Sequence, residues 1–225
     1  MFAADVLDTL RKSGLSGSSL TALSEDEIVK GLKEALAKGV EHSVTNLGRV
    51  GGYLNHTDVK IPMPDRLARV EKTLRAVKQE HLADEFVATM NRAAELAVPE
   101  AATIFSDAIR AMTLQDAKSL LSGPEDAATQ YFRKVSAGRL EEKMLPVVKK
   151  TTETAGVTAS YKQLMEKASP TVSIFNIDPK ALDLDQYVAT KAVDGLFKRI
   201  ADEEKTIRQN PAARTTQLLK KVFNR

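Results

Sequence analysis

Two pairs of opposite charges lie in neighbouring segments that are otherwise apolar and rich in alanine. Arg92 and Glu95 are three residues apart, and Asp107 and Arg110 repeat the same spacing further along the chain. On α-helices, side chains at this spacing share one face and can form an ion pair. If other helices cover these faces, the paired charges would converge on a ligand pocket. If the faces meet water, the same residues are surface salt bridges.

Tyr131 completes the set of candidate ligand-binding residues. It lies in the stretch DAATQYFRK, residues 126–134. At helical spacing, Thr129 and Arg133 could face a cleft while Tyr131 and Phe132 pack beside it. The alternative is that both rings belong to the core, as aromatic residues at helical spacing commonly do.

Other kinds of chemistry have little support in the sequence. The chain has no cysteine, which excludes disulfides, thiolate catalysis and cysteine-based zinc or iron–sulfur sites. His81, Asp84 and Glu85 share a helical face and could ligate a metal, but acids in a first helical turn also complement the helix dipole. Phosphate-loop, dinucleotide, nucleophile-elbow and H-E-x-x-H signatures are missing. We therefore predict no catalytic residues, no metal and no cofactor.

Basic residues gather at the C-terminal end of the chain. The formal net charge is only +3, yet residues 206–225 hold five basic side chains and no acid. Three of them, Arg214, Lys220 and Lys221, could contact an anionic surface or a protein partner. The alternative is a solvated helix end whose cations suit the helix dipole. Nucleic acid is not an expected partner at so small a net charge.

The hydrophobic pattern predicts α-helices along most of the chain. Ser24 and Glu27 form a capping box at the start of a helix that reaches about Leu47. Further helices are expected over residues 65–79 with Val77 inward, over 80–98 and 99–112, and from an N-cap at Thr113. Glycine or proline signals then predict separate helices over 124–136 and 139–154, followed by 158–168, 185–208 and 211–223.

Two longer connections interrupt these helices. Residues 48–64 contain Gly51, Gly52 and two prolines, but their apolar side chains predict an ordered loop. Residues 169–185 form the second connection. The expected fold is all-α, a single irregular bundle of about eight to ten helices over residues 24–225, preceded by an N-terminal segment, 1–23, with a short helix.

Several long stretches resemble a bacterial family known as domain of unknown function four-one-nine-seven. They include GLKEALAKGV, VKIPMP, MNRAAELAVPEA, IFSDAIRAMTLQDAKSLLSG, YVATKAVDGLFKRIADEEKTIRQNP and ARTTQLLKKVF, in this order between Glu27 and Phe223. The resemblance implies an all-helical fold and, because family members often look exported or lipid-anchored, a place in the Gram-negative envelope. It carries no established activity.

The leading hypothesis is a non-enzymatic helical binding protein of the bacterial cell envelope, with a small amphipathic or lipid-like ligand whose anionic head meets Arg92 or Arg110. A hydrolase-like enzyme with a carboxylate/Arg site is one alternative. A scaffold that binds its partner through the basic C-terminal helix is another. The sequence has no run of 18 apolar residues, and its start lacks the pattern of a signal peptide. A periplasmic location is expected if a signal was removed, and a cytoplasmic one otherwise.

Overall fold

The computed structural model describes residues 24–167 and 183–210. Predictions for the N-terminal segment 1–23, most of the second connection and the basic residues Arg214, Lys220 and Lys221 lie outside the described residues. The helices are α2 (Glu25–Leu47), η1 (Asp65–Leu67), α3 (Ala68–Ala76), α4 (Glu80–Ala97), η2 (Val98–Glu100), α5 (Ala101–Ala111), α6 (Leu114–Ser122), α7 (Ala127–Thr154), α8 (Val157–Lys167) and α10 (Leu184–Gln209).

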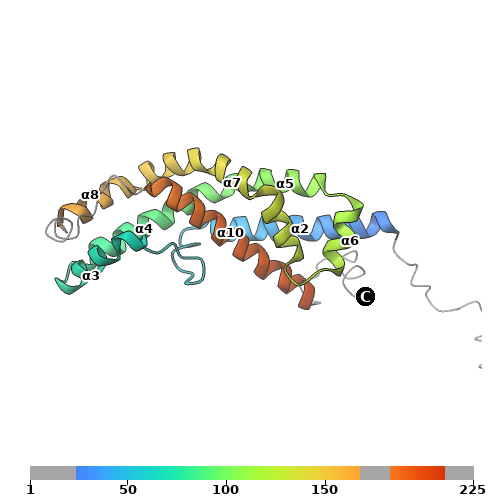
Figure 1. The fold of residues 1–225 in the computed structure, drawn as a ribbon, viewed down its shortest axis with the longest axis horizontal. Helices are drawn as coiled ribbons and strands as arrows, with labels where there is room; N and C mark the ends of the chain where they lie inside the picture. Colours follow the sequence, from blue (N-terminus) through green and yellow to red (C-terminus); the bar gives the residue numbers. More distant parts are fainter. Residues whose placement is uncertain (1–23, 168–182, 211–225) are drawn as a thin grey trace, which may run out of the picture.

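The described helices form one elongated bundle without strands, which confirms the all-α prediction (Figure 1). The long helix α10 packs against α7, α2 and α4. At one end of the bundle, α3 and α8 pack beside the first half of α4, and at the other α5 and α6 lie against α2. Every described helix is too short or too polar to cross a bilayer.

Side-chain caps fix two helix starts where the sequence predicts them. The Ser24 hydroxyl accepts a hydrogen bond from the Glu27 amide at 3.2 Å, and the Glu27 carboxylate accepts one from the Ser24 amide at 2.9 Å. Thr113 and Asp116 make the same reciprocal pair at the start of α6. Each box satisfies two amides that lack a partner within the helix.

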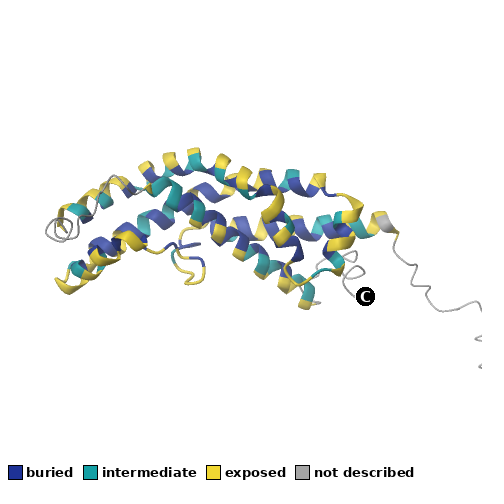
Figure 2. Cartoon of the chain, viewed as in Figure 1, coloured by how far each residue is buried: buried dark blue, intermediate teal, exposed yellow. Residues whose placement is uncertain are grey.

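Three phenylalanine rings join α5, α7 and α10 in the core. Phe105 meets Phe132 and Phe197 edge to face, with ring centroids 5.4 and 5.9 Å apart. All three rings are buried. Figure 2 shows that each helix has a buried side, which faces the neighbouring helices, and an exposed side, which faces outward.

Two sequence-based predictions about helix boundaries are wrong. Residues 127–154 form one continuous helix, α7, rather than two helices separated near Gly138. A side chain at Gly138 would meet no atom within 4 Å, so this glycine marks no turn or close approach. Val77 is 58% exposed rather than inward, because α3 ends at Ala76 and Lys78 adopts a φ of 60°.

The connection between α2 and η1 is ordered, as predicted. We call residues 48–64 the bracing loop. Five of its apolar or ring-bearing side chains pack against the helices, four of them buried (Tyr53, Val59, Ile61 and Met63) and Leu54 partly buried. Gly51 has a φ of +81°, and a side chain at Gly52 would lie 2.4 Å from the Leu47 carbonyl oxygen. Both positions therefore require glycine.

Candidate functional site

Asn91 on α4 holds the second half of the bracing loop. Its Oδ1 accepts a hydrogen bond from the Ile61 amide at 2.8 Å, and its Nδ2 donates to the Ile61 carbonyl at 2.8 Å. The same Nδ2 donates to the Val87 carbonyl at 2.7 Å. Asn91 is completely buried. Its side-chain amide supplies the hydrogen-bond partners that the backbone N–H and C=O of Ile61 would otherwise find in a neighbouring strand or in water.

Glu95, one turn further along α4, holds the first half of the loop. Its Oε1 accepts hydrogen bonds from the amides of Tyr53 at 3.2 Å and Leu54 at 3.5 Å. Arg92 Nη1 donates to its Oε2 at 3.3 Å. The sequence places Arg92 and Glu95 opposite the apolar face of this helix. The structure nevertheless buries Glu95, at 2% exposure, because the bracing loop covers that side of α4.

Tyr53 ties the loop to α10. Its hydroxyl donates to the Ala192 carbonyl at 2.8 Å. The ring packs against Gly195, where a Cβ would lie 2.8 Å from the ring carbon Cε1. Burial, and secondarily the negative charge of Glu95, raise the pKa of the Tyr53 phenol well above its usual range. Tyr53 is thus a neutral, enclosed anchor.

The bracing loop forms one wall of a polar cleft of about 410 Å³. The second wall comes from α10, and residues in the last turns of α2 complete the lining. The lining residues are Ser43, Asn46, Leu47, Arg49, Val50, Gly51, Gly52, Asn55, His56, Arg199, Asp202 and Glu203. We call this space the loop cleft. Its volume lies within the range of small-molecule sites.

Ion pairs organise the α10 side of the loop cleft. Arg199 Nη2 lies 3.1 Å from Asp58 Oδ1, and Arg199 Nη1 lies 3.6 Å from Asp202 Oδ2. His42 Nδ1 lies 2.6 Å from Glu203 Oε1. These contacts connect α10 to α2 and to the tip of the bracing loop, so both walls of the cleft are held in place.

The predicted site residues do not gather at one place. Arg92 meets Glu95, and Arg110 Nη1 lies 3.8 Å from Asp107 Oδ1. No hydrogen bond or ion pair joins the two pairs among the described residues. Asp107 instead has Arg139 of α7 as a second partner at 3.8 Å, and the Arg110 side chain is 78% exposed.

Tyr131 lies apart from both pairs. Its ring meets Phe132 at a centroid distance of 5.8 Å. Partial burial, followed by the charge of Asp116, raises the pKa of its phenol. The Tyr131 ring is partly buried and packs against the core. These contacts fit the alternative that the rings of Tyr131 and Phe132 are core residues.

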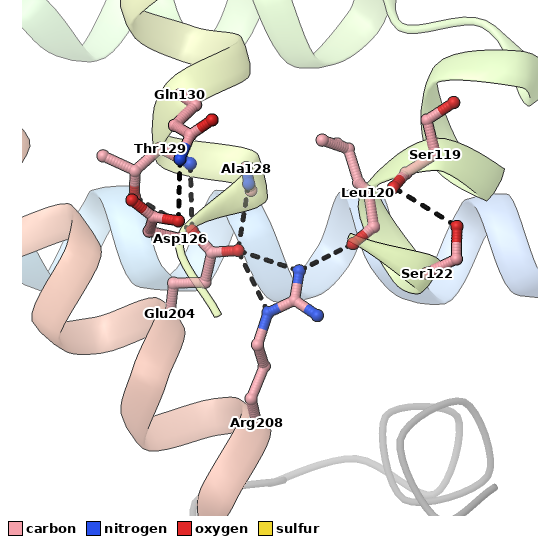
Figure 3. Close-up of polar contacts among 9 residues, drawn as sticks. All are labelled: Ser119, Leu120, Ser122, Asp126, Ala128, Thr129, Gln130, Glu204 and Arg208. Carbon is pink, nitrogen blue, oxygen red and sulfur yellow. Dashed lines mark hydrogen bonds and ion pairs between the residues drawn. The ribbon is translucent and has the colours of Figure 1, made fainter. Parts of the chain in front are cut away.

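A second buried carboxylate, Glu204 on α10, holds the start of α7 (Figure 3). Its oxygens accept hydrogen bonds from the amides of Ala128 and Thr129 and from the Thr129 hydroxyl, each at 2.9 Å. Asp126, the N-cap residue of α7, makes no side-chain cap. Glu204 therefore supplies from another helix the acceptor and the negative charge that a helix N-terminus favours.

Arg208 connects this cluster to α6. Its guanidinium donates to Glu204 Oε1 at 2.9 and 3.0 Å and to the Leu120 carbonyl at 2.7 Å. The neighbouring apolar notch, lined by Leu32, Leu36 and Ile207 among others, holds about 10 Å³, which is room for roughly one water molecule. The Glu204–Arg208 cluster joins three helices and has a structural role.

Within the histidine–acid group on α4, Asp84 belongs to a surface ion-pair network. Asp84 Oδ1 accepts from Arg75 Nη2 at 2.8 Å, and Glu71 shares the same guanidinium. Over residues 24–167 and 183–210, no three His, Asp or Glu side chains are placed to hold a metal ion.

Sequence reasoning did not select the residues of the loop cleft. Arg49, His56 and Arg199 come from a loop and a distant helix, and no motif spacing connects them. Two signals were nevertheless present in the sequence: the adjacent glycines at 51 and 52, and an interruption of 17 residues (48–64). Ordered loops of this length in small domains usually serve a function.

The comparisons with known proteins identify a family without assigning an activity. A family model described as "Protein of unknown function (DUF4197)" matches residues 22–224. No curated protein and no solved structure matches the chain. The match extends over nearly the whole chain and includes both the bracing loop and the helices that hold it, so the protein belongs to the DUF4197 family.

Proposed function

We propose that this protein is a non-enzymatic binding protein whose loop cleft takes a small polar ligand. The observation that carries the proposal is the bracing loop itself. A loop of 17 residues is held in one conformation by two buried side chains of α4 and by the hydrogen bond from its own Tyr53 to the backbone of α10, and it forms a wall of a cleft of about 410 Å³. A pre-formed site lowers the cost of ordering on binding, and a few fixed polar groups orient the ligand within it.

The manner in which the loop is held supports this proposal. Burying a carboxylate and an amide is costly unless each is fully hydrogen-bonded. Here Glu95 and Asn91 make hydrogen bonds with the loop backbone rather than with each other. An apolar helix face would pack a shorter connection with less desolvation. These buried polar groups therefore maintain the conformation of the bracing loop.

The same contacts favour binding over the hydrolase-like alternative. A catalytic carboxylate needs an oxygen that can reach substrate. Both oxygens of Glu95 already accept hydrogen bonds from protein groups, and its side chain is buried. Asp107 and Arg110 lie on α5 with partners of their own. We place the ligand at the loop cleft rather than beside Arg92 or Arg110 for this reason.

Native mass spectrometry of the full chain, purified from cells that produce it naturally, tests the proposal. We expect a bound small molecule on the wild type. Asn46→Trp and Val50→Trp, which each place a large side chain on the cleft lining, should both lose the added mass. Lys150→Trp, on an exposed position of α7, is the matched control and should keep it. An added mass that survives both cleft variants, or its absence from the wild type, would reject the proposal.

We further propose a location in the cell envelope, which the family resemblance supports. Fractionation of the native cells, with an antibody against the full chain, measures this directly. Recovery with the soluble cytoplasmic markers would exclude an envelope location and would leave the binding proposal intact.

A further inference from the structure

The two walls of the loop cleft carry charges of opposite sign. The bracing-loop wall presents Arg49 and His56, and the α10 wall presents Asp202 and Glu203 with Arg199. The Arg49 side chain makes no hydrogen bond or ion pair with any described residue. Among residues 24–167 and 183–210 its guanidinium therefore has no ion-pair partner, and it is available to an anionic group.

The α10 wall keeps a negative charge after its own ion pairs are counted. Arg199 is the only cation that the described part of α10 contributes to the cleft lining, and it is shared between Asp202 at 3.6 Å and Asp58 at 3.1 Å. Glu203 contacts His42, and this imidazole compensates the carboxylate only when it is protonated. The side chain of Asp202 remains 55% exposed, so an oxygen of it is accessible to a cationic group.

We propose that the ligand of the loop cleft is dipolar, with a carboxylate or phosphate group at Arg49 and an amino group at Asp202. This inference rests on the proposed function and names the chemical class of its ligand. A ligand with one charge satisfies one wall and leaves the other unmatched. A ligand with both charges satisfies the two walls together, and lining groups of opposite sign orient it within the cleft.

A matched set of linear probes tests the inference. Amide chemical shifts of the full chain are followed by NMR during titration with 4-aminobutanoate, butanoate and butylammonium. We expect 4-aminobutanoate to shift the amides of residues 49–56 and 202–203 saturably, with a Kd about tenfold below that of either singly charged probe. Each singly charged probe supplies half of the proposed contacts.

Charge-removing variants assign the two ends of the probe. Arg49→Gln should weaken 4-aminobutanoate to the affinity of butylammonium, and Asp202→Asn should weaken it to that of butanoate. Lys150→Gln and Glu142→Gln remove exposed charges elsewhere on α7 and should leave every Kd unchanged.

Other outcomes overturn the dipolar inference. Equal binding of butanoate and 4-aminobutanoate would indicate an anion site, and equal binding of butylammonium a cation site. Absence of shifts at residues 49–56 with all three probes would also reject it. A small molecule seen by native mass spectrometry would in each of these cases keep the proposed function, with a ligand of different chemistry.

Discussion

At the scale of single residues, two buried side chains of α4 direct hydrogen bonds to the backbone of the bracing loop. Asn91 satisfies both the amide and the carbonyl of Ile61, and Glu95 accepts from two consecutive amides of the loop. No side-chain polar atom that is buried among the described residues lacks a hydrogen-bond partner. Truncating one of these residues therefore leaves backbone groups without partners in a dry environment.

Asn91→Ala tests this role. The change removes both partners of Ile61, and we expect it to lower the free energy of unfolding by about 3 kcal/mol. Urea unfolding followed by circular dichroism measures the loss. Glu85→Ala, on an exposed position of the same helix, should change stability by less than about 0.5 kcal/mol. Equal effects of the two changes would mean that the Asn91 bridge contributes nothing.

Tyr53 predicts a specific loss of stability at alkaline pH. Its pKa is raised in the folded state above the ordinary value of 10.0. The unfolded chain therefore releases this proton at a lower pH than the folded chain does. The contribution of Tyr53 is complete below about pH 10 and is lost as the pH rises further.

Tyr53→Phe should remove that dependence. The variant loses the hydrogen bond to Ala192, at a cost of about 1 kcal/mol at neutral pH, but its stability should fall less steeply between pH 9 and 11.5. Urea midpoints measured across this range give both slopes. Parallel curves for the two proteins would show that another group causes the alkaline loss.

The pairing of Arg92 with Glu95 follows from their spacing, and the sequence predicts it correctly. The burial of Glu95 does not follow, because its partners Tyr53 and Leu54 are about 40 residues away in the chain. Helical periodicity reports which face a residue occupies on its own helix. It contains no information about a loop that returns to cover the polar face.

At the scale of elements, α7 shows why a glycine alone does not end a helix. The segments on both sides of Gly138 carry helical patterns, and no turn or side-chain cap interrupts them in the structure. Capping signals at Ser24 and Thr113 gave correct starts because each includes a reciprocal partner three residues later. A single glycine has no such second signal.

Two glycine substitutions compare a glycine in open space with a glycine at a close contact. Gly138→Ala adds a methyl group in open space within a helix and should raise stability by about 0.5–1 kcal/mol. Gly195→Ala places a methyl group 2.8 Å from the buried Tyr53 ring and should lower stability by roughly 1–3 kcal/mol. Thermal unfolding of both variants measures the difference. A loss of stability in Gly138→Ala would instead support a break in α7.

Glu204 supplies the N-terminal cap that α7 lacks in its own sequence. Glu204→Ala removes the acceptor of two α7 amides and the carboxylate that pairs with Arg208, and we expect the free energy of unfolding to fall by roughly 3–5 kcal/mol. Glu142→Ala on the exposed side of α7 is the matched change, with a loss below about 0.5 kcal/mol. Urea unfolding distinguishes them. A small effect at Glu204 would mean that water replaces the carboxylate.

At the scale of the whole molecule, the all-α class and most helix positions follow from the hydrophobic pattern, and the loop cleft does not. Its walls come from α2, the bracing loop and α10. They meet only after the chain has returned through six α-helices of the described residues, α3 to α8. Local periodicity determines helices, whereas the cleft depends on how a long loop is anchored to helices remote in sequence.

The anchoring predicts unusual protection for a loop. We expect the amides of Tyr53 and Ile61 to exchange hydrogen as slowly as those of the core helices, because opening them requires α4 and the loop to separate. The amides of Thr57 and Asp58, at the exposed tip, should exchange fast and serve as the internal control. Exchange measured by NMR at neutral pH gives both rates. Fast exchange at all four positions would contradict a braced loop.

The enclosure of Tyr53 also gives the molecule an optical reporter. The chain has no tryptophan, so its ultraviolet emission comes from four tyrosines. Tyr131, Tyr161 and Tyr187 are partly accessible, whereas Tyr53 is shut off from solvent and bonded through its hydroxyl to α10. A soluble quencher should reduce the fluorescence of the three accessible tyrosines and leave that of Tyr53 unchanged. Detachment of the loop would then be visible in real time, without any label.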